Sequence, residues 1–283
     1  MRIPSLRGLA LTANNGSFAV DIQHLSVGYS NGVTALDDVS VQLPIGAICA
    51  VLGANGGGKS TLCKALMGIQ RPHSGSVRLF GGAVNRMLKR NTIAYVPQSD
   101  DIDWDFPVSV QDVVMMGRQG QMNWLRIPSR DDKRRVAQSL ERVGMQAVAR
   151  RQIGELSGGQ KKRVFIARAL AQHARLMLLD EPFTGVDMTT ENDLLDILRE
   201  ERNAGTTIMV VTHNLSSVPD YSDQVMMLNR RVIACGPTAQ TFTATHLGNT
   251  FGGVVNELLK VTGAATCEGN VALGRSQLPE YPQ

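Results

Sequence analysis

Short apolar runs recur along this chain, and the stretches between them have a helical pattern. Residues 18–27 and 39–43 alternate apolar and polar positions with a period of two, which predicts two half-buried strands joined by a turn at residues 30–32. Residues 48–52, 176–180 and 206–211 are nearly continuous apolar runs, which is typical of buried strands. Further strands are expected at residues 75–80, 92–96, 224–228 and 232–235.

Helical patterns fill most of the intervals. Helices are expected at residues 59–68, 110–116, 129–143, 157–171 and 189–202. Strands that alternate with helices predict an α/β fold with a parallel sheet, whereas the first two strands suggest a separate antiparallel sheet. Residues 99–171 carry little strand signal, so we expect them to form an inserted helical subdomain.

The bulk properties describe an ordinary globular protein. The chain has 283 residues, 43% of them hydrophobic, and 29 Lys and Arg against 25 Asp and Glu give a formal charge of +4. This small excess does not call for nucleic acid as a partner. Cys49 and Cys63 lie in apolar runs and no C-x-x-C pair is present, which favours buried, reduced thiols in a cytosolic protein.

The ends of the chain are poorly patterned. We expect a weakly ordered leader at residues 1–17, one main domain at residues 18–245 and a partly disordered extension at residues 246–283. Residues 39–58 carry no charge, but Pro44 and several glycines make them strand, turn and loop. We therefore expect no transmembrane helix and no secretory signal, and any membrane role must come from a partner.

A glycine-rich loop follows the strand at residues 48–52. Its sequence, Gly53-Ala54-Asn55-Gly56-Gly57-Gly58-Lys59-Ser60-Thr61, fits the phosphate-binding pattern G-x-x-x-x-G-K-[ST] between a strand and a helix. Glycines let backbone N–H groups approach phosphate oxygens, and the helix N-terminus and the lysine add positive charge. The hydroxyl of Ser60 is suited to bind a Mg ion that bridges two phosphates.

Two acids end the apolar run at residues 176–180. Ligands of parallel sheets bind at the carboxyl ends of the strands, which is where Asp180 and Glu181 are expected. Asp180 is suited to hold Mg, directly or through water. Glu181 is suited to orient and deprotonate the water that attacks the terminal phosphate.

A second anion-binding helix start is expected at Leu156-Ser157-Gly158-Gly159-Gln160. This segment matches the LSGGQ signature, and the chain resembles the ATP-binding cassette (ABC) transporter ATPases over about residues 18–245. The resemblance implies a P-loop NTPase (RecA-like) core with an N-terminal antiparallel β-subdomain and an inserted α-helical signature subdomain. It also implies a homodimer in which the Ser157 helix start of one subunit faces the Lys59 loop of the other.

The resemblance assigns further residues. It implies that Tyr29 stacks on adenine, that Gln98 senses Mg and the membrane subunit, and that Asp187 lies in the dimer-contact loop. It also implies that His213 is the switch histidine near the terminal phosphate. The expected cofactors are ATP and Mg, with Ser60, Gln98 and Asp180 at the metal. Ala54 and Gly57 in the loop, and Thr184-Gly185-Val186 before Asp187, depart from the common family pattern without removing a functional side chain.

The segments at residues 103–108, 113–118 and 180–187 resemble the manganese, iron and zinc importer branch, above all its manganese/iron members. This resemblance implies an ATPase at the cytoplasmic face of the inner (plasma) membrane, with permease subunits and an extracytoplasmic solute-binding protein. The metal is expected to be handled by other subunits. The alternatives are an importer or exporter ATPase for another substrate, a soluble ABC protein acting on DNA or ribosomes, and a nucleotide-binding regulatory module.

Other local patterns favour simpler interpretations. Asp101, Asp103 and Asp105 suggest a calcium loop, but Phe106 stands where such loops need glycine. Trp104, Phe106 and Pro107 are more typical of an apolar contact surface beside Gln98. The basic clusters at residues 150–151 and 161–163 lack interleaved aromatic residues, so we expect solvated helix faces rather than nucleic-acid contacts.

Overall fold

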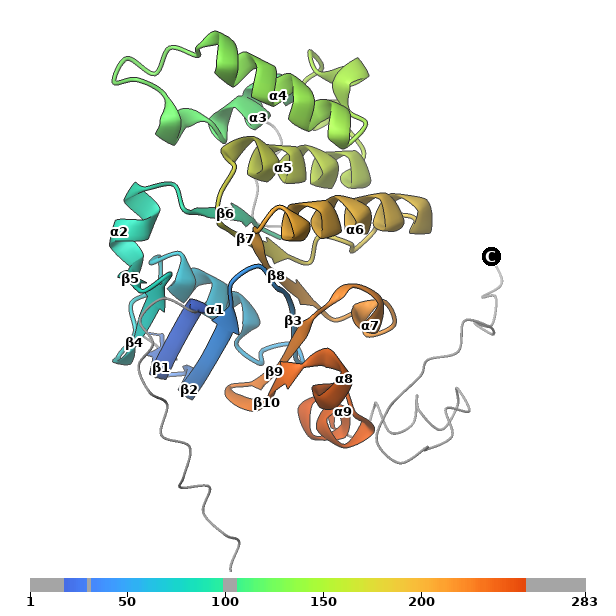
Figure 1. The fold of residues 1–283 in the computed structure, drawn as a ribbon. Helices are drawn as coiled ribbons and strands as arrows, with labels where there is room; N and C mark the ends of the chain where they lie inside the picture. Colours follow the sequence, from blue (N-terminus) through green and yellow to red (C-terminus); the bar gives the residue numbers. More distant parts are fainter. Residues whose placement is uncertain (1–17, 30–31, 99–105, 253–283) are drawn as a thin grey trace, which may run out of the picture.

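The computed structural model describes residues 18–29, 32–98 and 106–252, which form two sheets and the helices around them (Figure 1). The four-stranded sheet has the order β2-β1-β4-β5, and the six-stranded sheet has the order β10-β9-β3-β8-β7-β6. The strands are β1 (Phe18–Gly28), β2 (Thr34–Pro44), β3 (Ile48–Leu52), β4 (Ser74–Leu79), β5 (Gly82–Ala83), β6 (Ile93–Val96), β7 (Leu176–Asp180), β8 (Thr207–Thr212), β9 (Gln224–Asn229) and β10 (Arg231–Pro237).

The helices are α1 (Lys59–Leu66), α2 (Val84–Lys89), α3 (Val110–Met116), α4 (Arg130–Arg142), α5 (Gly158–Gln172), α6 (Met188–Asn203), α7 (Val218–Tyr221), α8 (Thr238–Thr241) and α9 (Ala244–Phe251). The segment expected to be helical contains α3, α4 and α5, which stack together beyond β6 (Figure 1). Among the described residues, no helix combines the length and the apolar character needed to cross a bilayer.

The six-stranded sheet is buried on both faces. In β3, Ile48, Ala50 and Leu52 pack into one hydrophobic cluster, while Cys49 and Val51 pack into the other. The first cluster includes residues of α3 to α6, and the second includes residues of α1 and of the four-stranded sheet. Burial on both sides explains why this strand is a continuous apolar run rather than an alternating one.

Strand pairing agrees with the expected α/β class. β9, β3, β8, β7 and β6 pair in parallel, whereas β10 pairs antiparallel with β9, so the sheet is mixed. β1 and β2 pair antiparallel, as expected. The expected domain boundary after residue 245 falls inside α9, whose Leu247 is buried in the main core. The expected leader and residues 253–283 lie outside the described part of the chain.

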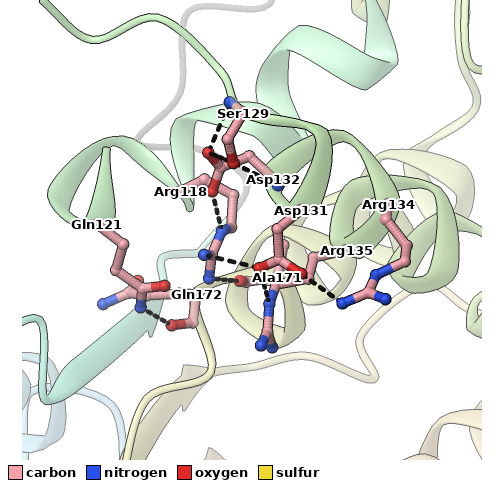
Figure 2. A network of polar contacts seen from close by, with 9 residues as sticks. All are labelled: Arg118, Gln121, Ser129, Asp131, Asp132, Arg134, Arg135, Ala171 and Gln172. Carbon is pink, nitrogen blue, oxygen red and sulfur yellow. Dashed lines mark hydrogen bonds and ion pairs between the residues drawn. The ribbon is translucent and has the colours of Figure 1, made fainter. Parts of the chain in front are cut away.

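The buried side chain of Arg118, two residues after α3, forms an ion pair with α4 and a hydrogen bond with α5 (Figure 2). Arg118, only 5% exposed, donates from Nε to Oδ1 of Asp132 at 2.9 Å and from Nη1 to the carbonyl oxygen of Ala171 at 3.0 Å. Asp132 also forms a capping box with Ser129 at the start of α4. Hydrogen bonds from Ser129, and then the Arg118 charge, hold the pKa of Asp132 below its usual value although burial opposes this. Its carboxylate therefore serves as a helix cap and as the counter-ion of Arg118.

Removal of the Arg118 charge should destabilise the helical block. Arg118→Met leaves the buried Asp132 carboxylate without its cation, so we expect a loss on the order of 3 kcal/mol in the free energy of unfolding. Urea titration followed by circular dichroism measures this loss. Arg134→Met is the matched control, because Arg134 is an exposed partner of Asp131 and its loss should cost about 0.5 kcal/mol or less. Equal effects of the two substitutions would contradict the role of the buried pair.

Candidate functional site

The glycine-rich loop joins β3 to α1 and is packed against β9 and the turn after it. A Cβ atom at Gly53 would lie 2.1 Å from the carbonyl oxygen of Leu228, so only glycine fits at this position. The backbone N–H of Arg230 donates to the carbonyl oxygen of Gly57 at 2.9 Å. Gly58, which precedes α1, has a φ of +95°, which other residues rarely adopt. Close approach and backbone conformation together fix the shape of the loop.

Lys59 is the first residue of α1, and its side chain extends back to the start of this loop. Its side chain is buried, and Nζ donates to the carbonyl oxygens of Gly53 at 2.7 Å and Ala54 at 3.1 Å. Burial lowers the pKa of Lys59, and the negative charges of Glu181 and Asp180 oppose that shift. The loop therefore surrounds a confined ammonium group, which is the arrangement that a phosphate needs.

Tyr29 reaches this loop from the end of β1. Its hydroxyl lies 2.9 Å from Oγ1 of Thr61, in the first turn of α1, and 39% of the residue is exposed. The preceding residue, Gly28, is held by two side chains. Its N–H donates to Nδ1 of His73 at 3.0 Å, and its carbonyl oxygen accepts from Gln70 at 3.2 Å. The structure thus brings Tyr29 to the glycine-rich loop, which we call the phosphate loop.

The paired acids lie at the carboxyl end of β7. Asp180 is 3% exposed, and Glu181 is the first residue after the strand. Glu181 has a φ of +52°, a left-handed conformation that is unusual outside glycine. Oε2 of Glu181 lies 2.8 Å from Nδ1 of His213, the residue after β8, and accepts from the Thr184 hydroxyl at 2.8 Å.

Burial alone would raise the pKa of Glu181, but the hydrogen bonds from His213 and Thr184 and the charge of Lys59 bring it below its usual value. The carboxylate is therefore ionised at neutral pH. Because β3, β8 and β7 are neighbours in one parallel sheet, their carboxyl ends bring Lys59, His213 and Glu181 to the same edge. Gln98 follows β6 at this edge and is exposed.

The Ser157 segment forms a separate helix start. The Ser157 hydroxyl accepts from the N–H of Gln160, and the Gln160 side chain accepts from the N–H of Ser157, so the two residues form a capping box. Gly158 is exposed and a Cβ there would contact nothing within 4 Å. Among the described residues, the hydrogen bonds of Ser157 and Gln160 stay within the first turn of α5. This group is thus not joined to the phosphate loop of its own chain.

Asp187 caps α6. Its carboxylate accepts from the N–H of Thr190 at 2.9 Å and from the Thr190 hydroxyl at 2.8 Å, and these bonds lower the pKa of Asp187. Trp104, on which the expected apolar contact surface partly rests, lies outside the described residues. Phe106 of the same segment is described and is 59% exposed.

The expectation of a fully solvated basic face at residues 161–163 was wrong. Nζ of Lys162 donates to the carbonyl oxygens of Glu181, at 3.1 Å, and of Thr184. Arg163 donates to the Thr190 hydroxyl at 2.6 Å. Thr184 and Lys162 thus contact the candidate site, which the sequence did not predict. The contact of Thr184 could have been predicted from its position, because it follows Glu181 by three residues on a turn.

The family model described as "ABC transporter" matches residues 36–184, more than half of the chain. The chain belongs to the ABC transporter family. The ATP-binding subunits of that family hydrolyse ATP, so this chain is an ATPase. The expected fold is confirmed by its structural neighbours.

Curated relatives of this ABC protein cover most of its length. It is 55% identical over 249 residues to the "Chelated iron transport system membrane protein YfeB" of Yersinia pestis, covering 88% of this chain and 84% of the relative. It is 52% identical over 235 residues to the "Manganese transport system ATP-binding protein MntA" of Synechocystis, with coverage of 83% and 90%. The zinc transport system ATP-binding protein TroB of Treponema pallidum is 44% identical over 243 residues, with coverage of 86% and 90%.

Solved structures of ABC proteins match the fold. An inward-facing transporter described as being of the metal-chelate type aligns with a TM-score of 0.72 and 29% identity, over 82% of this chain and 88% of that chain. The cbiO1 subunit of Clostridium perfringens, part of the ABC transporter complex cbiONQ, aligns with a TM-score of 0.69 and 30% identity, over 86% and 99%.

The packing of the phosphate loop predicts opposite tolerances at two glycines. Gly53→Ala forces a methyl group against the Leu228 carbonyl, so we expect a loss of about 3 kcal/mol in stability without nucleotide. A methyl group at Gly56 would contact no atom within 4 Å. Gly56→Ala should therefore lose only about 1 kcal/mol in stability, from the strain of a φ of +76°. Urea unfolding of both variants tests the difference. A Gly53→Ala protein no less stable than Gly56→Ala would refute the described packing.

Proposed function

We propose that this ABC ATPase powers the uptake of transition-metal ions, with manganese or iron as the substrate, through separate membrane subunits. The observation that carries the substrate class is the group of relatives, above 40% identity and over most of the chain, whose names refer to iron, manganese and zinc transport. ATP binding and hydrolysis by the chain's own residues would drive the transport of the ion.

The phosphate loop is the proposed binding site for the ATP phosphates. Backbone N–H groups of residues 53–61 and the ammonium of Lys59 would hold the phosphate oxygens, and Tyr29 would stack on the adenine. In the structure Lys59 donates to loop carbonyls, which a phosphate oxygen would replace as acceptor. The hydroxyl of Tyr29 contacts Thr61, so the ring already lies beside the loop.

The oxygen groups around the loop fit a Mg ion. Mg prefers hydroxyl, amide and carboxylate oxygens, and Ser60, Gln98 and Asp180 supply these three types. Asp180 is buried at the end of β7, and its negative charge acts on Lys59 of the loop, so a carboxylate lies near the place proposed for the phosphates. When bound, the ion would neutralise the phosphate charge that develops during transfer. Ser60, Gln98 and Asp180 are the proposed residues at the metal, and Gln98 is also the proposed link to the membrane subunit.

Glu181 is the proposed general base. Its carboxylate is ionised, partly buried and held by His213 and Thr184, so it can accept a proton from a water beside the terminal phosphate. His213 would hold that carboxylate in place and contact the phosphate. These roles use the side chains that the strand ends bring together.

A homodimer would complete each ATP site. The start of α5 presents backbone N–H groups near the exposed Gly158, and the hydrogen bonds of Ser157 leave the first helical N–H groups for an anion. Because this start is not joined to the loop of its own chain, we infer that it binds the ATP held by a second copy. Asp187, which caps α6, would lie at the contact between the copies.

The transported metal would be handled by other subunits. Among the described residues, no group of three or more His, Cys, Asp or Glu side chains could hold a metal ion. We infer a peripheral position on the cytoplasmic face of the inner (plasma) membrane, bound to permease subunits, with an extracytoplasmic solute-binding protein delivering the ion. Nucleic acid is not a proposed partner. Export remains the alternative direction of transport.

The base assignment predicts a separation of binding from turnover. Glu181→Gln keeps the shape of the side chain but removes the base, so ATP turnover should fall about 100-fold or more while ATP affinity persists and a closed dimer accumulates. Lys59→Ala should weaken ATP binding itself. Glu141→Gln, on the exposed side of α4, is the control. Turnover assays and equilibrium nucleotide binding measure the effects, and normal turnover of Glu181→Gln would refute the assignment.

The transport assignment predicts a specific loss of uptake. A strain that lacks this chain should lose high-affinity uptake of manganese or iron, and its growth should recover when that metal is added. Uptake of manganese, iron and zinc is measured separately, after complementation with the wild-type chain or with Glu181→Gln. Unchanged uptake of all three metals would contradict the proposed substrate class.

A further inference from the structure

Lys162 lies on α5, four residues after Gly158, and its ammonium reaches the turn that follows β7. Nζ donates to the carbonyl oxygen of Glu181 at 3.1 Å and to that of Thr184. These two residues are the ends of one tight turn, because the N–H of Thr184 also points to the Glu181 carbonyl. A single cation therefore binds both ends of the turn that begins with the proposed base.

This turn has an unfavourable backbone. Glu181 has a φ of +52°, and a residue other than glycine holds such a conformation only where its surroundings enforce it. Two enforcing contacts come from the sheet and from α5. The N–H of Glu181 donates to the Val211 carbonyl at 2.9 Å, and its carbonyl oxygen accepts from Lys162.

The backbone conformation of Glu181 decides where its carboxylate points. Oε2 lies 2.8 Å from Nδ1 of His213 and accepts from the Thr184 hydroxyl, and Thr184 is the other residue that Lys162 holds by its backbone. The contact with Lys162 thus acts on the carboxylate along two routes: the backbone of Glu181 itself and the position of the Thr184 hydroxyl.

The next residue of α5 extends the same contact. Arg163 donates to the Thr190 hydroxyl at 2.6 Å, and Thr190 in turn donates to Asp187 at the start of α6. Val186 lies against Gly159, where an added Cβ would be 3.6 Å from its Cγ1. One helix therefore contacts residues 181, 184, 186 and 190 of the segment that contains the proposed base and the proposed dimer contact.

We propose that Lys162 is a positioning residue for ATP hydrolysis, which holds the turn from Glu181 to Thr184 and thereby aims the Glu181 carboxylate. This inference rests on the proposed role of Glu181 as the base. Because Lys162 stands on the helix that begins at Ser157, it also ties the anion-binding helix start to the hydrolytic turn of the same chain. In a dimer, each chain would contribute its Ser157 helix start to one ATP site and its Glu181 to the other, and Lys162 would connect these two parts.

The test compares three variants of the full chain by steady-state ATP hydrolysis. Lys162→Met keeps the length of the side chain but removes its charge and N–H donors, so kcat should fall about 10-fold to 100-fold with KM for ATP changed by about 2-fold or less. Lys162→Arg keeps cationic donors and should restore most of kcat. Lys89→Met, on the exposed face of α2, should resemble the wild type.

A double-variant comparison separates positioning from general stability. If Lys162 acts through Glu181, adding Lys162→Met to Glu181→Gln should not lower the residual turnover further. Nucleotide affinity and thermal unfolding, measured on the same preparations, establish that each variant is folded.

Several outcomes would overturn the proposal: an unchanged kcat for folded Lys162→Met, a raised KM with normal kcat, no recovery with Lys162→Arg, or an additive loss in the double variant. The proposed function fails differently. If Glu181→Gln keeps wild-type turnover, Glu181 is not the base, whatever the effect of Lys162→Met. If kcat falls in Lys162→Met but a strain that lacks this chain keeps its metal uptake, the transport proposal fails and the positioning role stands.

Discussion

The site depends on the parallel alignment of β3, β8, β7 and β6 in a sheet that is buried on both faces. Parallel pairing places the carboxyl ends of these strands at one edge, and the hydrophobic clusters on both faces of the sheet hold the strands in the core. Each strand then delivers one functional segment to that edge, and none of these segments needs a regular structure of its own. The loop with Lys59, the acids after β7, His213 and Gln98 are all positioned this way.

Much of this arrangement could be predicted from the sequence. The strand at residues 176–180 was expected with the observed limits, because a continuous apolar run ends abruptly at two acids. The start of α4 at Ser129 followed from capping chemistry, since Ser129 and Asp132 form the capping box that their spacing suggests. The phosphate loop followed from a motif whose glycines and lysine have a direct physical purpose.

What could not be predicted depends on contacts between segments distant in sequence. The short helices α2 and α7 have too few turns to show a clear period, and α9 crosses the expected domain boundary because Leu247 packs into a core made by other elements. A basic cluster on a helix is usually solvated, and nothing local to Lys162 shows that a turn some twenty residues later packs back against it. The burial of Arg118 could not be predicted from its neighbours in sequence, because its partner Asp132 lies on the next helix.

The packing of the phosphate loop has a consequence for synthesis of the chain. The loop motif ends at Thr61, yet its backbone rests on Leu228 and Arg230, which the ribosome adds more than 160 residues later. A nascent chain that stops before β9 therefore contains the complete motif without the strand that shapes it. The loop therefore gains its contacts with Leu228 and Arg230 only after β9 has joined the sheet.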